Sequence, residues 1–278
     1  MMKTSMQLKS LIRNLSKEKN IQAEIILRNF MLERFLERMS LSIYKDKFIL
    51  KGGMLIAAMV GIDTRTTMDL DATIKGQAID KKNIETIINE ILEIPIEDNV
   101  ILKLNDIMEI HEESDYPCFR ISINALFDKT KQNIKLDITT GDFITPKEVE
   151  YNFKLLFEER FLNVFAYNLE TVLAEKFETI IVRSIANTRM RDFYDIYILT
   201  LTQDINYSTL NSAIKTTANK RFTSKQLEHY KDVLNIISKN TELRNLWERY
   251  RKSYPYSVDI TWDMIISKLY EFASKINI

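Results

Sequence analysis

Hydrophobic and polar positions in the middle of the chain alternate in short runs, a pattern typical of strands with one buried face. In 118–127 the apolar residues occupy every second position, and in 134–141 the polar positions between them are Lys135, Asp137 and Thr139. The sequence DKTKQN between these stretches predicts a hairpin turn. Together with short apolar runs, the alternation predicts strands at 47–50, 68–74, 100–110, 118–127 and 134–141.

Apolar residues that recur every three or four positions predict helices elsewhere. Helical structure is expected over 5–39, a helix directly after Gly52 and Gly53, and an amphipathic helix over 80–93 with Asp80 as its N-cap. Beyond Phe161 the helical period predicts helices at 168–185, 189–201, 207–218, 223–239, 241–250 and 261–276. The sequence therefore predicts an α+β fold: a mixed β-sheet with flanking helices over 1–155, followed by an all-helical part over 156–278.

The composition excludes a disordered chain and a uniformly basic coat for nucleic acid. Hydrophobic residues make up 45% of the 278 residues, and 39 Lys and Arg balance 39 Asp and Glu. The charges are segregated: residues 1–50 carry 10 basic and 5 acidic residues, 51–159 carry 12 and 21, and 201–278 carry 12 and 8. This segregation is compatible with solvated helix faces or with a carboxylate-rich site flanked by basic elements that bind a polyanion.

The cysteine content and the hydropathy of the sequence predict the cellular compartment of the protein. Cys118 is the single cysteine, so no disulfide framework is possible within the chain. The longest apolar run has nine residues, 54–62, whereas a membrane span needs about 20. The beginning of the sequence lacks the apolar core of a secretory signal. We expect a soluble cytoplasmic protein that does not bind membranes.

Three aspartates form the strongest chemical signal. Asp69 and Asp71 are two positions apart on a predicted strand, which places both carboxylates on one face, and Asp137 lies on the polar face of another. Carboxylates gathered in this way repel one another unless a divalent cation lies between them. Three of them on adjacent strands can bind two Mg²⁺ ions for phosphoryl or nucleotidyl transfer. The alternative is an ordinary surface pair of aspartates, which is common.

Gly52 and Gly53 stand between a predicted strand and a helix. Glycines there let backbone N–H groups approach a phosphate at the positive end of the helix dipole. The alternative, a tight turn that needs positive φ, is compatible with this reading because the turn would expose the amides. Arg65 and Thr67 directly precede the aspartate strand, where they can orient its carboxylates or meet a phosphate; Arg65 can equally be a surface arginine.

A second charged group lies in the helical part. It comprises Lys176, Arg189, Arg191, Asp192 and Asp195. Asp192 and Asp195 share a helix flank, and Arg191 and Asp195 have the i, i+4 spacing of an ion pair. Apolar neighbours allow the stem of Lys176 to pack while its ammonium group reaches into a cleft. Without further context, ion pairing between helices accounts for this group.

The ordered series GGM…RTTMDLD, KLD, AEKFETI and RMRDFYDIY, over about residues 45–200, resembles the four motifs of the AbiEii/AbiGii toxin family. The resemblance implies a nucleotidyltransferase-like fold of the DNA polymerase beta-like superfamily. The implied catalytic residues are Asp69, Asp71, Asp137, Lys176 and Asp195, of which the first three would be metal ligands. The implied nucleotide-binding residues are Gly52, Gly53, Arg65, Thr67 and Lys135. Lys176 would neutralise phosphate charge, and Asp195 would place the acceptor or the base.

The resemblance also implies a biological role. Such a protein would be the toxin of a bacterial toxin–antitoxin or abortive-infection system, active in phage defence. It would use Mg²⁺ or Mn²⁺ to transfer nucleotides from an NTP to an RNA acceptor, expected to be the 3′ end of tRNA, and so block growth. The basic ends of the chain would bind the RNA backbone. A cognate antitoxin encoded nearby is the expected partner, with or without direct contact.

The sequence departs from the family pattern at two positions, of which Met54 keeps a non-catalytic alternative open. Met54 replaces the usual Ser or Thr after the glycine pair, so a hydroxyl contact with phosphate is lost, while Ala72 replaces a Phe in the core. One alternative is a nucleotidyltransferase that acts on a protein or a small molecule. The other is a non-catalytic module that binds a nucleotide or a partner.

Overall fold

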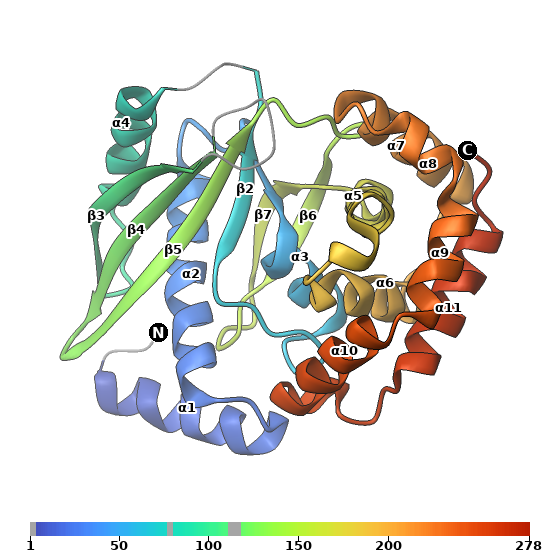
Figure 1. Cartoon of the computed structure of the whole chain (residues 1–278). Helices are drawn as coiled ribbons and strands as arrows, with labels where there is room; N and C mark the ends of the chain where they lie inside the picture. The colour runs from blue at the N-terminus through green and yellow to red at the C-terminus, as the bar shows by residue number, and fades with distance from the viewer. Residues whose placement is uncertain (1–3, 77–79, 111–117) are drawn as a thin grey trace. The chain divides into compact units, whose positions relative to one another are not determined.

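The computed structural model of the chain describes residues 4–76, 80–110 and 118–278. The chain divides into two compact units. The first comprises Met1–Asp142 and Val149–Ala166, and the second comprises Phe143–Glu148 and Tyr167–Ile278. The first unit contains a mixed sheet with flanking helices and the second is helical, which confirms the predicted fold class (Figure 1).

A seven-stranded sheet forms the centre of the first unit, within the part of the chain that the structure describes. Its strand order is β3-β4-β5-β2-β1-β7-β6. Strand β5 is parallel to β2, and β7 is parallel to β1, whereas the other neighbours are antiparallel. The strands are β1 (Phe48–Lys51), β2 (Leu70–Ile74), β3 (Val100–Ile110), β4 (Cys118–Phe127), β5 (Thr130–Thr140), β6 (Val149–Lys154) and β7 (Phe161–Ala166).

Two of these strands were not predicted. The expected helical part began at 156, but β7 follows that position and remains with the sheet of the first unit. Strands β6 and β7 pair with each other in a hairpin. Each of these strands has only six residues, and the turn between them is charged. The alternation was therefore too short to predict strands. The predicted turn at 128–133 is also shorter than expected, because β5 already begins at Thr130.

The helices of the first unit are α1 (Ser5–Lys19), α2 (Ala23–Leu41), α3 (Gly52–Val60) and α4 (Lys81–Leu92). The helical segment expected over 5–39 consists of two helices, α1 and α2. Asn20 takes a left-handed conformation with φ 53°, which ends α1 because the helix cannot continue through it. Asp80 caps α4 as predicted, since its side chain accepts a hydrogen bond from the backbone N–H of Asn83.

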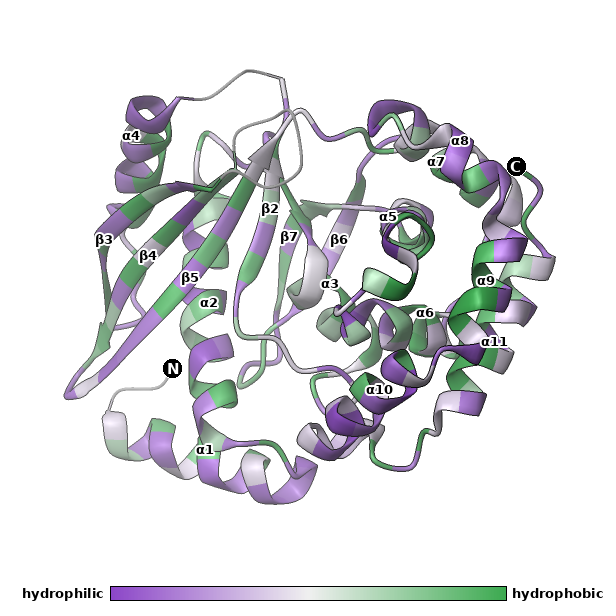
Figure 2. Ribbon diagram, in the orientation of Figure 1, coloured by the Kyte–Doolittle hydropathy of each residue, from purple (hydrophilic) through white to green (hydrophobic). Residues whose placement is uncertain are grey.

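One face of the sheet is covered by helices. Helix α2 packs against β5 and β7, and α4 packs against β3. The strand residues on that face are apolar and buried, and those on the opposite face are polar, as the alternating colours of β4 and β5 show (Figure 2). The predicted functional residues Lys135 and Asp137 lie on the polar face.

Helix α2 contains a buried ionic network, although its charged positions had been compatible with a solvated helix face. Glu33 accepts hydrogen bonds from the backbone N–H of Leu156 at 3.0 and 3.3 Å. Arg160 donates to both carboxylate oxygens of Glu37. These contacts come from the turn between β6 and β7. The network therefore holds that hairpin onto α2.

The second unit is helical in its described residues, apart from the segment 143–148. Helix α5 is central and contacts α6, α7, α8 and α9, while α11 contacts α6, α9 and α10. The expected helix over 223–239 is broken at His229 into two helices. The α-helices are α5 (Leu169–Arg183), α6 (Met190–Thr202), α7 (Tyr207–Lys220), α8 (Ser224–Glu228), α9 (Tyr230–Lys239), α10 (Thr241–Ser253) and α11 (Trp262–Ser274). Among the described helices of both units, none is both long and apolar enough to cross a membrane.

Candidate active site

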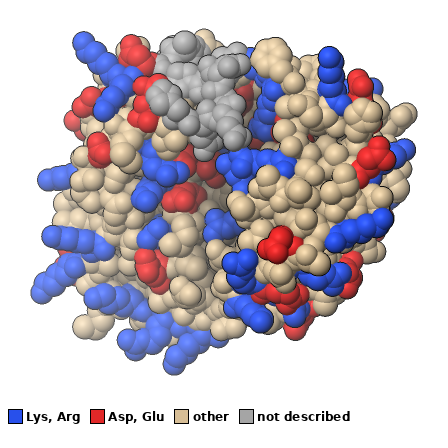
Figure 3. Space-filling view, in the orientation of Figure 1, with Lys and Arg blue, Asp and Glu red and all other residues tan. Residues whose placement is uncertain are grey.

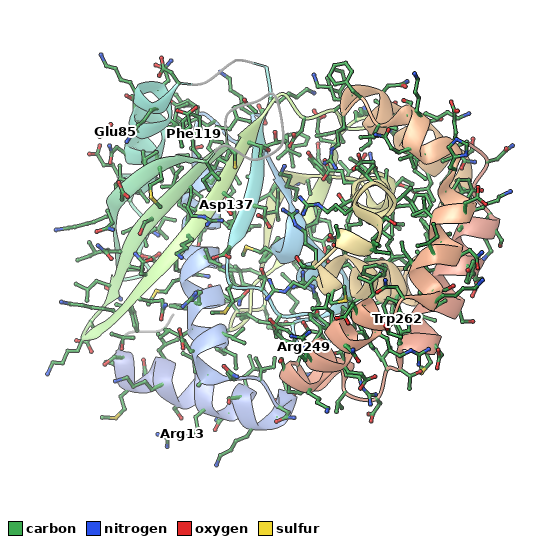
Figure 4. All side chains as sticks on the ribbon, in the orientation of Figure 1. Arg13, Glu85, Phe119, Asp137, Arg249 and Trp262 are labelled. Atoms are coloured by element: carbon green, nitrogen blue, oxygen red, sulfur yellow. The ribbon has the colours of Figure 1, made fainter. Side chains whose placement is uncertain are left out.

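A row of four charged residues crosses the sheet of the first unit. Asp71 on β2 is paired in register with Asp137 on β5 and with Lys51 on β1. Asp137 is paired with Arg120 on β4. Residues paired in this way point to the same side of a sheet, so the row reads Arg120, Asp137, Asp71, Lys51. Figure 4 marks Asp137 on β5, beside β2. The predicted adjacency of the two aspartate strands is confirmed.

The glycine pair packs directly against this row. The structure has no separate turn after β1, because α3 begins at Gly52 itself, with φ +64°. A Cβ on Gly52 would lie 2.0 Å from Asp71 Oδ2, and a Cβ on Gly53 would lie 2.7 Å from Thr67 Oγ1. The backbone N–H of Gly53 donates to Asp71 Oδ2 at 3.1 Å. Asp71 and Thr67 therefore approach the backbone so closely that only glycine fits at these two positions.

The segment before β2 is held in place by buried residues. Thr67 Oγ1 donates to the carbonyl of Asp69 at 3.1 Å, and Asn29 of α2 donates to the carbonyl of Thr67 at 3.0 Å. The guanidinium of Arg65 is buried and donates to the carbonyl of Thr66. Asp69 lies immediately before β2 and is half-buried. Arg65 and Thr67 thus fix the backbone that presents the two aspartates.

The local electrostatics disfavour ionised aspartates. Burial raises the pKa of Asp69, and the negative charge of Asp137 raises it further, against the opposing effects of Lys135 and Arg120. Burial also raises the pKa of Asp71; Lys51 and the N–H of Gly53 oppose this shift, and Asp137 and Asp69 add to it. Carboxylates that repel one another in this way favour a cation.

Arg120 is a site residue that the sequence analysis missed. Its Nε and Nη2 donate to Asp137 Oδ1 and Oδ2 at 2.8 and 2.6 Å. A signal was available, because the alternation of 118–127 puts Arg120 on the polar face together with Asp137. Lys51 was also missed: its Nζ donates to Thr139 Oγ1 at 2.7 Å and to Asp142 Oδ2 at 2.5 Å. Its position at the end of a short strand gave no such signal.

The donor chemistry of the aspartates fits a hard divalent cation, because all of their ligand atoms are carboxylate oxygens. Among residues 4–76, 80–110 and 118–278, however, no group of three or more His, Cys, Asp or Glu is arranged to hold a metal ion. Both carboxylate oxygens of Asp137 accept hydrogen bonds from Arg120. A cation that binds Asp137 would therefore have to replace this guanidinium group.

The second unit positions the remaining predicted residues. Lys176 of α5 lies 2.8 Å from Asp192 Oδ1 and 2.7 Å from Asp195 Oδ2, both on α6. Burial alone would lower the pKa of Lys176, but the two carboxylates outweigh it and raise the value. The side chain of Asp195 is 0% exposed. Arg191 donates to Tyr254 Oη at 2.8 Å. The predicted grouping of Lys176, Asp192 and Asp195 is observed.

A mixed sheet that brings carboxylates into register on adjacent strands, beside a glycine pair at a helix start, is characteristic of a nucleotidyltransferase-like protein. The model of the family "Nucleotidyl transferase AbiEii toxin, Type IV TA system" matches residues 34–268. The chain belongs to this family and is a nucleotidyltransferase of a toxin–antitoxin system. Membership of the family implies a nucleotide substrate and a cognate antitoxin.

Solved structures of similar proteins include ones from Helicobacter pylori and Paracoccidioides brasiliensis. JHP933 from Helicobacter pylori is 17% identical with a TM-score of 0.45, over 90% of this chain and 95% of that chain. An antigenic nucleotidyltransferase-like protein from Paracoccidioides brasiliensis is 15% identical with a TM-score of 0.36, over 81% and 94%. Among curated proteins, no sequence matches the chain significantly.

Proposed function

We propose that the protein transfers nucleotides from an NTP to an RNA acceptor, the 3′ end of tRNA, in a Mg²⁺- or Mn²⁺-dependent reaction that blocks growth in the bacterial cytoplasm. The observation that carries this proposal is the register of Asp71 with Asp137, with Asp69 immediately before β2. Bound there, the cation would stabilise charge on the attacking and leaving oxygens. Asp69 and Asp71 would hold it, with Asp137 as the third ligand.

The glycine pair supports binding of the nucleotide. Gly52 and Gly53 begin α3, and the N-terminus of a helix favours a phosphate through its dipole and its unpaired N–H groups. The backbone N–H of Gly53 donates a hydrogen bond to Asp71. This amide can therefore bind a phosphate only if the carboxylate of Asp71 rotates away from it. Lys135 is exposed on the same face of β5 as Asp137, where its ammonium can meet a phosphate. Met54 is buried in the core, so it does not replace the hydroxyl contact.

An RNA acceptor is supported by the polar face of β3, β4 and β5. Lys103, Lys131 and Lys135 are exposed on it, with Asp106 as an opposing charge. Basic side chains also line the left and lower parts of the view in Figure 3. A polynucleotide backbone binds such a surface through its phosphates. The asparagine and serine side chains of this face bond to one another, as Asn133 does to Ser122 at 2.8 Å.

Lys176 and Asp195 keep the roles that the family resemblance implies, with one refinement from their geometry. Because Asp195 is fully buried against Lys176, it would act by holding the ammonium group rather than by touching the acceptor. Lys176 would then supply positive charge to a phosphate.

The experiment is nucleotide incorporation with each of the four NTPs, purified tRNA and Mg²⁺ or Mn²⁺, beside a reaction with EDTA. We expect labelled tRNA that depends on the cation and disappears with Asp69→Asn. Label that reaches only proteins or small molecules in a lysate would show a different acceptor.

The arrangement of Asp137 favours one alternative, a non-catalytic module that binds a nucleotide. Its carboxylate is neutralised by Arg120, so the chain can be stable with no cation bound. Growth inhibition by the expressed protein separates the two. If Asp69→Asn abolishes incorporation in vitro but leaves growth inhibition intact, binding rather than transfer is the active property.

A further inference from the structure

Arg120 is bound to Asp137 in the geometry of a strong ion pair. Both oxygens of the carboxylate are used, each by a different nitrogen of the guanidinium fork. The two residues face each other across β4 and β5, so the pair needs no distortion of the sheet. The guanidinium therefore supplies Asp137 with the positive charge that a divalent cation would otherwise provide.

A second arginine–aspartate pair, in the core of the first unit, shows what distinguishes the pair of Arg120 and Asp137. Arg38 also binds both oxygens of a carboxylate, that of Asp98, at 2.7 and 3.0 Å. Those side chains are 4% and 6% exposed, and Arg38 donates further to the carbonyls of Arg34 and Val100. Arg120 and Asp137 are 37% and 19% exposed. Water can replace the partner of a half-exposed ion pair at low cost, whereas breaking a buried pair leaves an uncompensated charge.

We propose that Arg120 is an exchangeable counterion of Asp137: it holds the carboxylate in the cation-free protein and moves to a nucleotide phosphate when Asp137 becomes a ligand of the cation. This inference rests on the proposed function. Arg120 is then a positioning residue for the cation and a binding residue for the nucleotide. The ion pair with Arg120 in the cation-free protein also agrees with the finding that no three carboxylates among the described residues are arranged to hold a metal ion.

The side-chain chemistry matches both partners. A guanidinium binds carboxylate and phosphate oxygens with the same planar fork, so Arg120 can exchange one for the other without losing its hydrogen bonds. Asp71 lies in register beside Asp137 on β2, and Asp69 immediately precedes that strand, so both carboxylates are placed to share the cation with Asp137 after the exchange.

The test measures binding without turnover in the full-length protein. Mn²⁺ affinity is determined by calorimetry, and affinity for a non-hydrolysable NTP analogue is then measured at saturating Mn²⁺. Arg120→Gln is expected to tighten Mn²⁺ binding about tenfold and to weaken analogue binding at least fivefold. Lys129→Gln removes the same charge from an exposed position in the turn between β4 and β5, so it controls for general electrostatics. It is expected to change Mn²⁺ affinity less than threefold.

The two opposite shifts separate exchange from a merely structural role. Unchanged or weakened Mn²⁺ binding in Arg120→Gln, or a Mn²⁺ gain equal to that of Lys129→Gln, would overturn the proposal, as would unchanged analogue affinity. If Arg120→Gln does not fold, Arg120→Lys takes its place, with smaller shifts in the same directions expected. A wild-type protein that binds no Mn²⁺ refutes the proposed function itself. Wild-type binding with no effect of Arg120 refutes this inference alone.

Discussion

The carboxylate of Asp71 lies against Gly52 so closely that a Cβ on the glycine would meet its Oδ2 at 2.0 Å. The same oxygen accepts the N–H of Gly53 at 3.1 Å. The glycine pair and the aspartate motif, 18 residues apart in sequence, therefore form one packed unit. The geometry of the site depends on this contact because nothing larger than hydrogen fits between strand β2 and the start of α3.

Gly52→Ala should consequently disable the site. The added methyl group displaces Asp71, and a misplacement of about 1 Å can reduce turnover about 100-fold. The positive φ of Gly52 adds a destabilisation of about 1–2 kcal/mol. Incorporation assays and denaturant unfolding measure the two effects. Gly76→Ala is the matched control, because Gly76 also has positive φ (+91°) but nothing within 4 Å of an added Cβ. Equal activity losses in the two variants would disprove the contact argument.

Asp71→Asn is expected to stabilise the fold while abolishing incorporation. Burial and the neighbouring Asp137 and Asp69 raise the pKa of Asp71, so the folded protein retains its proton at a higher pH than the unfolded chain does. Stability is therefore lost as pH rises through this range. The neutral asparagine can still accept the N–H of Gly53, so unfolding at neutral pH should require about 1 kcal/mol more than in wild type. Asp46→Asn, at an exposed position, should change neither property. A destabilised Asp71→Asn would contradict the electrostatic account.

Glu33→Gln should flatten the pH dependence of stability. Burial raises the pKa of Glu33 from 4.5 to about 8, despite Arg34 and the N–H of Leu156. Between these values the folded state binds one more proton than the unfolded state, so wild-type stability falls by up to about 1.4 kcal/mol per pH unit as pH rises. Glutamine retains an acceptor for Leu156 and carries no charge. Urea unfolding at pH 5, 7 and 9 measures the slope, with the exposed Glu18→Gln as control. Parallel slopes in wild type and Glu33→Gln would assign the dependence to other groups.

Lys176→Met should destabilise the second unit by about 3–5 kcal/mol, because it removes the cation that lies 2.7 Å from the fully buried carboxylate of Asp195. Adding Asp195→Asn should recover part of that loss, whereas independent sites would give additive losses. Thermal unfolding of wild type, both single variants and the double variant completes the cycle. Incorporation should stay abolished in the double variant even where stability returns, since the ammonium group is still missing. Recovery of activity along with stability would reduce Lys176 to a structural role.

The sequence by itself determined most of the elements, though not β6 and β7, and the faces on which their side chains lie. Alternation placed Lys135 and Asp137 on the polar face of β5, because successive residues of a strand point to opposite sides. The side chain of Asp80 was sufficient to predict the start of α4, since a cap bonds only three residues along the chain. The ordered motifs were sufficient to predict the family. All of these features depend on neighbours that are close in sequence.

Only the tertiary structure decided which residues far apart in sequence lie side by side across the sheet or in a buried network. Asp137 meets Asp71 because β5 joins the sheet beside β2, and it meets Arg120 through the register of β4 with β5. Glu33 lies on a helix whose charged positions also fit a solvated face, yet the turn between β6 and β7 buries it. Strand order, register and burial result from packing between segments far apart in the chain, and local periodicity contains no information about which partner each segment selects.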